Sequence, residues 1–192
     1  MPFDAGDLSD EALLAAYGRG EMRAARQLAD RVLPAVWRTA RRILGDAAEA
    51  EDVAQEAMLR LWRIAPEWRA GEAKVSTWLY RVTVNLCTDR LRKSGRGVAL
   101  DTVPEPEDGA PGVAAGLIEA DRMAALDAAL LALPDRQRQA VVLRHLEGLA
   151  NPEIAAIMGV GVEAVESLTA RGRRTLAALL AARKEDLGYD EA

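Results

Sequence analysis

Apolar residues recur every three or four positions along most of this chain, which is the pattern of amphipathic helices packed on a core. Glycines and prolines interrupt the pattern at several places and divide it into about four helices in each half. The interruptions fall at Gly18–Gly20, Gly45–Asp46 and Pro66–Ser76, and then at Leu133–Pro134, Glu147–Gly148 and Gly159–Gly161. Aromatic residues make up only 4% of the chain, whereas alanine and leucine are abundant. The sequence therefore predicts an all-α fold.

The helical pattern stops between Gly95 and Gly116, where prolines and glycines are frequent. Residues 100–121 hold six acids and no bases. This composition is typical of a flexible linker. We therefore expect two small helical domains, residues 8–94 and 117–182, joined by an acidic linker over residues 95–116.

Charge is distributed unevenly, although the net charge is −5. Residues 61–99 hold eight bases against three acids, and local charge matters more to a phosphate backbone than the total. The single cysteine, Cys87, and the single histidine, His145, exclude an internal disulfide and a Cys/His metal site. We expect both to be packing residues. The first ten residues do not resemble a signal peptide, and no apolar run is long enough to span a membrane, so we expect a cytoplasmic protein.

Residues 151–168 have the spacing of a helix-turn-helix. Asn151 can cap the first helix with Pro152 after it, Ala155 is the small residue where the helices touch, and Gly159 suits the turn. The apolar anchors are Ile154, Met158, Val160, Val165 and Leu168.

The second helix of this unit has two faces at 100° per residue. One is predicted to pack inward and carries Val165, Leu168, Gly172, Leu176 and Leu179. The opposite face carries Glu163, Ser167, Ala170, Arg171 and Arg174, with Glu166 directed at a base edge or solvent. This face suits a major groove, where arginine reads guanine or phosphate. A helical hairpin whose arginines are merely solvated is the alternative.

The helix over residues 51–64 also has two faces, one of them apolar. The other carries Asp52, Gln55, Glu56 and Leu59. A lone exposed leucine among acids and amides is typical of a protein-docking strip. Taken alone, the strip also fits a solvated face, which is the commoner case.

The helix over residues 78–93 places Arg81, Asn85, Thr88 and Arg92 in line, with Trp78 beside them. The preceding loop adds Trp68, Arg69 and Lys74. Basic, amide and aromatic side chains together suit unstacked DNA, because flipped nucleobases stack on aromatic rings and expose hydrogen-bonding edges. Tryptophans are more often core residues, and we expect this of Trp62.

Three segments resemble the extracytoplasmic-function sigma factors, the smallest two-domain sigma subunits of bacterial RNA polymerase. "GDAAEAEDVAQEAMLRLW" (45–62) resembles their region 2.2, and "STWLYRVTVNLCTDRLRK" (76–93) resembles region 2.4. "LPDRQRQAVVLRHLEGLANPEIAAIMGVGVEAVESLTARGRRTL" (133–176) resembles regions 4.1 and 4.2. The segments occur in the family's order and cover most of the chain.

The resemblance implies roles for the faces described above. Asp52, Gln55 and Glu56, with Leu59, match positions that dock on the β′ clamp helices of core polymerase, and the β flap is a second expected contact. Arg81 and Asn85 match positions near the flipped base of the minus-ten element, and residues 68–75 match the loop that captures it. The residues expected to read the minus-thirty-five element are Ser167, Ala170, Arg171 and Arg174, with Glu166 beside them. An anti-sigma protein that holds the chain near the membrane is a further expected partner.

The chain departs from the family pattern at four positions. Val75 stands where phenylalanine is usual, and Ala170 replaces larger side chains. Ala150 and Gly161 stand where serine is common, which weakens each helix cap by about 1 kcal/mol if nothing substitutes.

No catalytic constellation is apparent, so we expect no enzymatic activity, no cofactor and no small-molecule substrate. Two other functions compete with the sigma-factor interpretation. A stand-alone helix-turn-helix regulator leaves the Arg81–Asn85 face unexplained, and a sigma mimic that sequesters an anti-sigma factor would have lost its DNA-reading residues. The acids Asp101, Glu105, Glu107 and Asp108 also suggest a linker that threads a basic polymerase channel.

Overall fold

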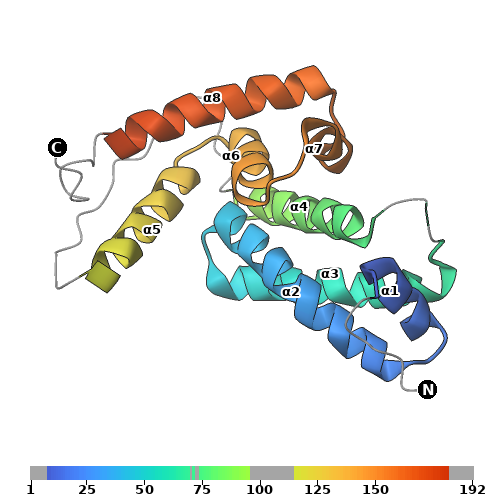
Figure 1. The fold of residues 1–192 in the computed structure, drawn as a ribbon. Coiled ribbons are helices and arrows are strands. Elements are labelled where there is room, and N and C mark those ends of the chain that lie inside the picture. The colour runs from blue at the N-terminus through green and yellow to red at the C-terminus, as the bar shows by residue number, and fades with distance from the viewer. Residues whose placement is uncertain (1–7, 70, 72–73, 96–114, 182–192) are drawn as a thin grey trace.

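The computed structural model describes residues 8–69, 71, 74–95 and 115–181, and all regular elements in these ranges are helical. The N-terminal domain contains α1 (Asp10–Gly18), α2 (Met22–Leu44), α3 (Ala47–Ile64) and α4 (Val75–Lys93), with a short 3₁₀ turn, η1 (Ala65–Glu67), after α3. The C-terminal domain contains α5 (Ala115–Leu131), α6 (Asp135–Val141), α7 (Asn151–Met158) and α8 (Val162–Ala181), with a π-helical turn, η2 (Val142–Leu146), after α6. The helices fall into the two groups that the sequence predicts, and Figure 1 shows their arrangement.

The N-terminal domain has a core of its own. Leu14 of α1, Leu28 of α2, Leu61 of α3 and Leu79 of α4 are buried within it. α3 begins four residues before the predicted start, because Asp46 caps it by accepting a hydrogen bond from the Glu49 N–H at 2.9 Å. The preceding turn depends on Gly45, which has φ 77° and ends α2 in the left-handed conformation.

The C-terminal domain is held by a smaller apolar cluster. Leu130, Leu133, Val141 and Val142 are buried there. α8 passes close to α6 at Gly172, where an added Cβ would lie 2.6 Å from Cγ2 of Val141. The absence of a side chain at Gly172 therefore sets how closely these two helices approach.

The two domains also pack against each other, which the sequence did not predict. One apolar cluster combines α4 residues such as Val84 and Cys87 with α7 residues such as Ile154 and Met158. Figure 1 shows α4 lying beside α7, and α2 also contacts α5 and α6 of the C-terminal domain. The predicted acidic linker, including Asp101, Glu105, Glu107 and Asp108, falls almost entirely outside the described residues.

Candidate nucleic-acid interface

The strip on α3 lies at the surface. Asp52, Gln55 and Leu59 are exposed and Glu56 is half-buried; half of the Leu59 side chain is accessible to solvent. Glu56 Oε1 accepts a hydrogen bond from Arg60 Nε at 2.8 Å, which lowers the pKa of the Glu56 carboxyl. The strip therefore presents an ionised carboxylate beside an accessible leucine.

Some side chains of the polar line on α4 face solvent, and others are bonded to neighbouring residues. Arg81, Asn85 and Arg92 are exposed, and Arg92 is paired with Asp89 of the same helix at 2.9 Å. The exposed Thr88 accepts a hydrogen bond on its Oγ1 from Nε2 of Gln139, in α6, at 2.9 Å. The middle of the line therefore faces solvent at Arg81 and Asn85, whereas Thr88 contacts the C-terminal domain.

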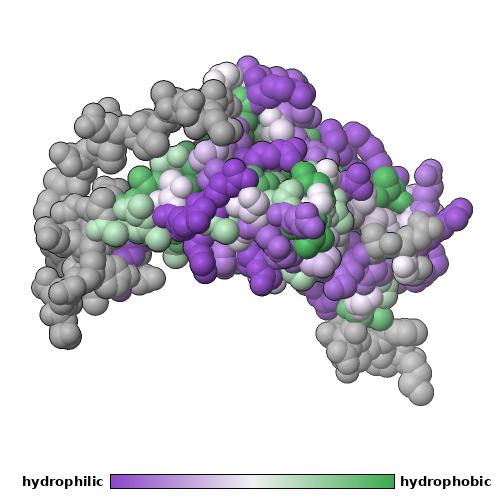
Figure 2. Space-filling view, turned by 90° about the horizontal axis from the view of Figure 1, so that it is seen from above, coloured by the Kyte–Doolittle hydropathy of each residue, from purple (hydrophilic) through white to green (hydrophobic). Residues whose placement is uncertain are grey.

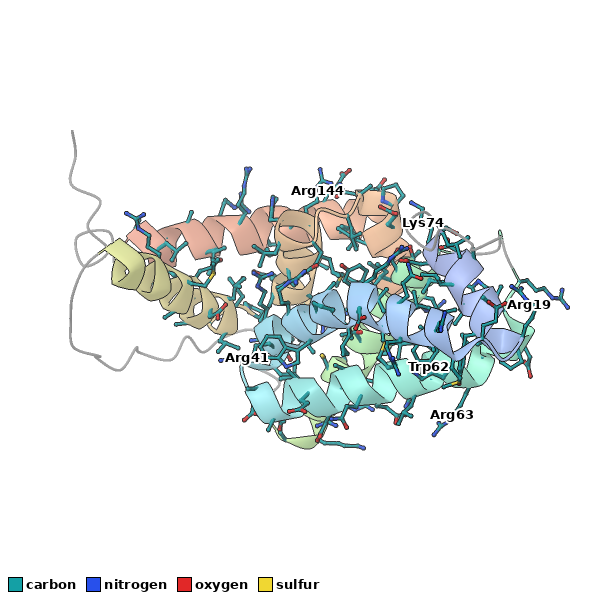
Figure 3. The ribbon with its side chains drawn as sticks, turned by 60° about the horizontal axis from the view of Figure 1, so that its bottom comes forward. Arg19, Arg41, Trp62, Arg63, Lys74 and Arg144 are labelled. Carbon is teal, nitrogen blue, oxygen red and sulfur yellow. The ribbon has the colours of Figure 1, made fainter. Side chains whose placement is uncertain are left out.

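The segment before α4 brings an aromatic pair to the same end of the domain. Trp68 and Trp78 are half-buried and meet edge to face, with ring centroids 6.3 Å apart. Arg69 and Lys74 are exposed, and Lys74 lies 3.6 Å from a carboxylate oxygen of Glu153 in α7. Figure 3 shows Lys74 on the same edge of the molecule as Arg144, away from Trp62 and Arg63 of α3. Residues 70, 72 and 73 of the predicted base-capturing loop lie outside the described residues.

Val75, where the family usually has phenylalanine, is fully buried in the N-terminal core. Its N–H donates to Oε1 of Glu11 at 3.0 Å, and this bond lowers the pKa of the Glu11 carboxyl. Glu11 thus supplies the cap that the Lys74 side chain does not provide. This contact explains why α4 begins three residues before the predicted Trp78.

The helix-turn-helix is present as α7 and α8. Gly159 has φ 64° and ψ 41°, and its N–H bonds to the carbonyl of Ala155. Ile154, Ala155, Met158 and Val165 are buried, whereas Val160 and Leu168 are partly buried. The predicted spacing of the turn and its anchors is therefore confirmed.

The predicted cap of α7 is wrong. Ala150 occupies the N-cap and Asn151 is the first helical residue, with a buried Oδ1 that has no hydrogen bond among the described residues. Glu153 compensates in part, because its Oε2 accepts the Ala150 N–H at 3.0 Å. Alanine has no side-chain acceptor, so only this half of a capping box exists.

The outer face of α8 is polar and open. Glu163, Glu166, Ser167, Ala170, Arg171 and Arg174 are all exposed. Arg171 Nη2 donates to Ser167 Oγ at 2.6 Å, which links two of the predicted reading residues. Val165 and Gly172 are buried on the inner face, with Leu168, Leu176 and Leu179 half-buried. Figure 2 looks at the molecule from the α8 side and shows hydrophilic residues over much of this surface.

Other predictions from the sequence divide between right and wrong. Cys87 is fully buried as expected, and Trp62 is half-buried against Tyr17, with ring centroids 4.8 Å apart. His145, expected to pack, is instead exposed and lies in η2. Partial desolvation together with the charges of Arg144 and Arg173 lowers its pKa.

The sequence did not predict a polar cluster around Glu147. Glu147 accepts a hydrogen bond on Oε2 from the Tyr80 hydroxyl at 2.9 Å, and on Oε1 from Arg42 Nη1 at 3.4 Å. We call these three residues the Glu147 network. They lie up to 105 positions apart in sequence, so no local pattern could reveal the contact.

The described residues form neither a membrane-spanning helix nor a clustered metal-binding group. Within them, no helix is long and apolar enough to cross a bilayer. Nor do three or more His, Cys, Asp or Glu side chains of the described segments converge as a metal-binding group.

Comparison with known proteins matches both domains. A family model of Sigma-70 region 2 matches residues 28–97, and one of Sigma-70 region 4 matches residues 123–176. The chain is 40% identical over 172 residues to the ECF RNA polymerase sigma factor SigM of Mycobacterium tuberculosis H37Rv, covering 90% of this chain and 85% of SigM. It is 38% identical over 160 residues to the ECF RNA polymerase sigma factor SigE of Mycolicibacterium smegmatis, covering 81% of this chain but only 60% of SigE.

A solved structure agrees with this assignment. The sigma factor RpoE of Bartonella quintana, in complex with the anti-sigma factor NepR, matches with a TM-score of 0.63 and 25% identity. The match covers 81% of this chain and 96% of RpoE. By the match to both region models and the identity shared along nearly all of SigM, the chain belongs to the ECF family of RNA polymerase sigma factors.

Proposed function

We propose that this protein is an alternative sigma factor that binds core RNA polymerase and directs it to two-part promoters. One observation carries the proposal: in a member of the sigma family, the exposed polar lines of α4 and α8 lie on two different domains, and the α3 strip is open for docking. The domains proposed for these tasks are residues 8–94 and 117–182.

Each surface has a separate task in this proposal. Asp52, Gln55, Glu56 and Leu59 contact the β′ clamp helices of the polymerase. The minus-ten element is bound by Trp68, Arg69, Lys74, Trp78, Arg81, Asn85, Thr88 and Arg92. The minus-thirty-five element is bound by Glu166, Ser167, Ala170, Arg171 and Arg174, and the C-terminal domain also meets the β flap.

The protein makes and breaks no covalent bonds in this scheme. Melting of the promoter is driven by binding, because a few kcal/mol of unstacking are offset by contacts to the extruded base and to the polymerase. We also propose that an anti-sigma factor covers these surfaces and can hold the protein near the membrane. RpoE, a structural relative, was solved in complex with an anti-sigma factor.

Run-off transcription with purified core polymerase on a promoter library tests the function. We expect transcripts from promoters that share a two-part motif. Leu59→Ala should weaken core binding at least fivefold, because truncating a central docking residue costs about 1 kcal/mol or more. Met22→Ala, which removes an exposed apolar side chain from the start of α2, is the control.

The competing functions give different results. Tight operator binding without polymerase, together with no transcripts, would identify a stand-alone regulator. Binding to an anti-sigma factor alone, with no affinity for core polymerase, would identify a sigma mimic.

A further inference from the structure

α1 contacts the chain on both sides of the proposed base-capturing loop, residues 68–75, which we call the capture loop. The segment that leads into this loop is η1, and the helix that follows it is α4. α1 packs against η1 and also contacts α4. Figure 1 shows α1 at the end of the domain where α3 passes toward α4. The match to the Sigma-70 region 2 model begins at residue 28, so this match assigns no role to α1.

At the leading end of the capture loop, Gly18 of α1 meets the backbone of η1. A Cβ added to Gly18 would lie 2.8 Å from the carbonyl oxygen of Ala65 and 3.4 Å from Cα of Pro66. The same Ala65 oxygen accepts a hydrogen bond from the Trp68 N–H at 3.3 Å. Trp68 is the first residue of the loop, and its ring meets that of Trp78 edge to face. The close approach at Gly18 therefore restrains the backbone that carries Trp68.

At the trailing end of the loop, Glu11 of α1 caps α4. Its Oε1 accepts a hydrogen bond from the Val75 N–H at 3.0 Å, whereas the Lys74 side chain makes no cap. The first amides of a helix have no partner within the helix, so they need an acceptor from elsewhere. The start of α1 is itself held in place, because Asp10 lies 3.6 Å from Arg31 of α2. The last residue of the loop is therefore tied to α1.

Both contacts lie on one face of α1. Glu11 and Gly18 are seven positions apart, which is close to two full turns, so they face nearly the same direction about 10 Å apart. Leu14, between them on this face, is fully buried in the N-terminal core. Ala65 and Val75 are ten positions apart, and an extended chain of that length spans roughly 33 Å. α1 therefore restricts the spacing between the two ends of the capture loop.

We propose that α1 is a brace for the capture loop, and that Glu11 is a positioning residue for recognition of the minus-ten element. The task of the loop rests on the proposed function, whereas the bracing contacts belong to the chain itself. Glu11 acts through the Val75 amide and does not touch DNA. Valine offers less apolar surface than the phenylalanine that is usual in the family at position 75, and the bond from α1 is a second source of support.

A loop that is held in its binding conformation binds more tightly than one that populates several conformations. When only a fraction of the molecules is competent to bind, the apparent Kd rises by the inverse of that fraction. Loss of a helix-capping acceptor typically shifts an equilibrium about fivefold. We therefore expect Glu11→Ala to weaken binding of the minus-ten element by about three- to fivefold.

The test uses the holoenzyme formed from the full chain and core polymerase. The probes are single-stranded oligonucleotides with the nontemplate sequence of a promoter chosen by run-off transcription, either intact or with one abasic site in the minus-ten element. The abasic position that weakens wild-type binding most identifies the captured base. Glu11→Ala should weaken binding of the intact strand and barely change binding of that abasic strand, because residue and base act through the same loop. A purely structural role would weaken both strands equally.

Three further variants make the comparison specific. Glu11→Gln keeps a side-chain oxygen that can accept the Val75 N–H, so it should retain most of the wild-type affinity. Gly18→Ala disturbs the leading end of the loop and leaves Glu11 in place, and it should also weaken the intact strand selectively. Asp46→Ala is the matched control, because Asp46 caps α3 at the end opposite η1. It should lower Tm and leave binding of both strands unchanged.

A second measurement needs neither polymerase nor DNA. Hydrogen exchange of the Val75 amide in the free chain reports the capping bond directly. Loss of the acceptor in Glu11→Ala should speed this exchange about fivefold. Glu11→Gln should exchange at nearly the wild-type rate.

Two results would overturn the brace. One is a Glu11→Ala holoenzyme that binds the intact strand as tightly as the wild type does. The other is an equal loss of affinity for the intact and abasic strands. A wild-type holoenzyme that binds no minus-ten strand would refute the proposed function instead. The brace would then be decided by the Val75 amide alone, supported by faster exchange in Glu11→Ala and refuted by an unchanged rate.

Discussion

At the level of single residues, the proposed reading face of α8 contains a hydrogen bond between two of its own side chains. Arg171 donates to the Ser167 hydroxyl at 2.6 Å and both are exposed. A guanidinium held in place loses less conformational freedom on binding than a free one. Under the proposed function, Arg171 therefore meets DNA with its guanidinium already held by Ser167.

Replacing Arg171 by alanine should weaken binding of the polymerase holoenzyme to the minus-thirty-five duplex by about 1–3 kcal/mol, and should relax base preference at one position. Arg171→Lys is the matched control, because it keeps the charge and loses the bidentate fork. Binding measured on promoters with a randomised minus-thirty-five element separates the two effects. Unchanged affinity and base preference in both variants would remove Arg171 from the reading face.

Cys87 predicts how stability responds to alkaline pH. Burial raises the pKa of its thiol from 9.0 to about 12, so the folded chain holds this proton more tightly than the unfolded chain. The free energy of unfolding should therefore fall as pH rises from about 9 toward 12. Below pH 9 the thiol is protonated in both states and contributes no pH dependence.

Urea denaturation from pH 7 to 11 measures this effect in the wild type and in Cys87→Ala. Alanine leaves a small cavity, which lowers stability by a similar amount at every pH. The two curves should run parallel below pH 9, and the wild-type curve should fall more steeply above it. Parallel curves up to pH 11 would show that the thiol does not ionise with the shifted pKa.

The sequence pattern predicted which side chains are exposed to solvent better than it predicted their hydrogen-bond partners. The outer faces of α4 and α8 follow from helical periodicity, and their residues lie where expected. Periodicity cannot show that Thr88 accepts a bond from Gln139, or that Tyr80 meets Glu147, because each contact depends on tertiary packing. The interface residues that the sequence analysis missed are those whose contacts depend on tertiary packing.

At the level of elements, the number of helices could be predicted but their starts could not. α3 and α4 both begin earlier than their apolar patterns suggest, because Asp46 and Glu11 supply acceptors to their first turns. Glu11 lies 64 positions from the amide that it caps. The π-helical turn η2 also has no periodic signature, although it places Glu147 in the interface.

The close approach of α6 and α8 leads to a prediction for Gly172→Ala. Alanine gains about 1 kcal/mol over glycine inside a helix, but its Cβ would lie 2.6 Å from Val141 Cγ2 and 3.2 Å from the Gln137 carbonyl oxygen. Overpacking of this kind costs about 1–3 kcal/mol, so we expect a net loss of stability. Urea denaturation measures it.

A second substitution identifies the cause of that loss. Val141→Ala removes the clashing methyl group, so the double variant should be more stable than the sum of the two single effects by about 0.5 kcal/mol or more. A Gly172→Ala chain more stable than the wild type would mean that α6 and α8 move apart freely.

At the level of the whole molecule, the two domains share an apolar cluster, in addition to their separate cores, that no sequence pattern could reveal. The apolar face of α7 could be recognised from spacing, but a pattern shows only that a face is buried and not what covers it. The cover is α4, about 70 positions away along the chain. The sequence led us to expect two domains that pack separately, whereas the structure shows an apolar cluster shared between them.

This interface is crossed by the ion pairs Arg42–Glu147 and Lys74–Glu153, which should contribute unequally to the free energy of unfolding. Arg42→Ala removes a partner from the nearly buried Glu147 and should cost about 1.5–3 kcal/mol, or roughly 3–12 °C in Tm for a chain of this size. Lys74→Ala breaks a pair whose lysine is 73% exposed and should cost at most about 1 kcal/mol. Thermal unfolding of both variants in one buffer measures the difference. Equal shifts in Tm would contradict the ranking.

The shared core also has a consequence for synthesis on the ribosome. The first domain can complete its own core from residues 13–79, but the apolar side of α4 stays uncovered until α7 has been made. At about 5–20 residues per second, that delay is on the order of several seconds. During translation, each nascent chain therefore exposes the apolar surface of α4 that α7 later covers. Chaperones or polymerase can bind this surface before α7 does.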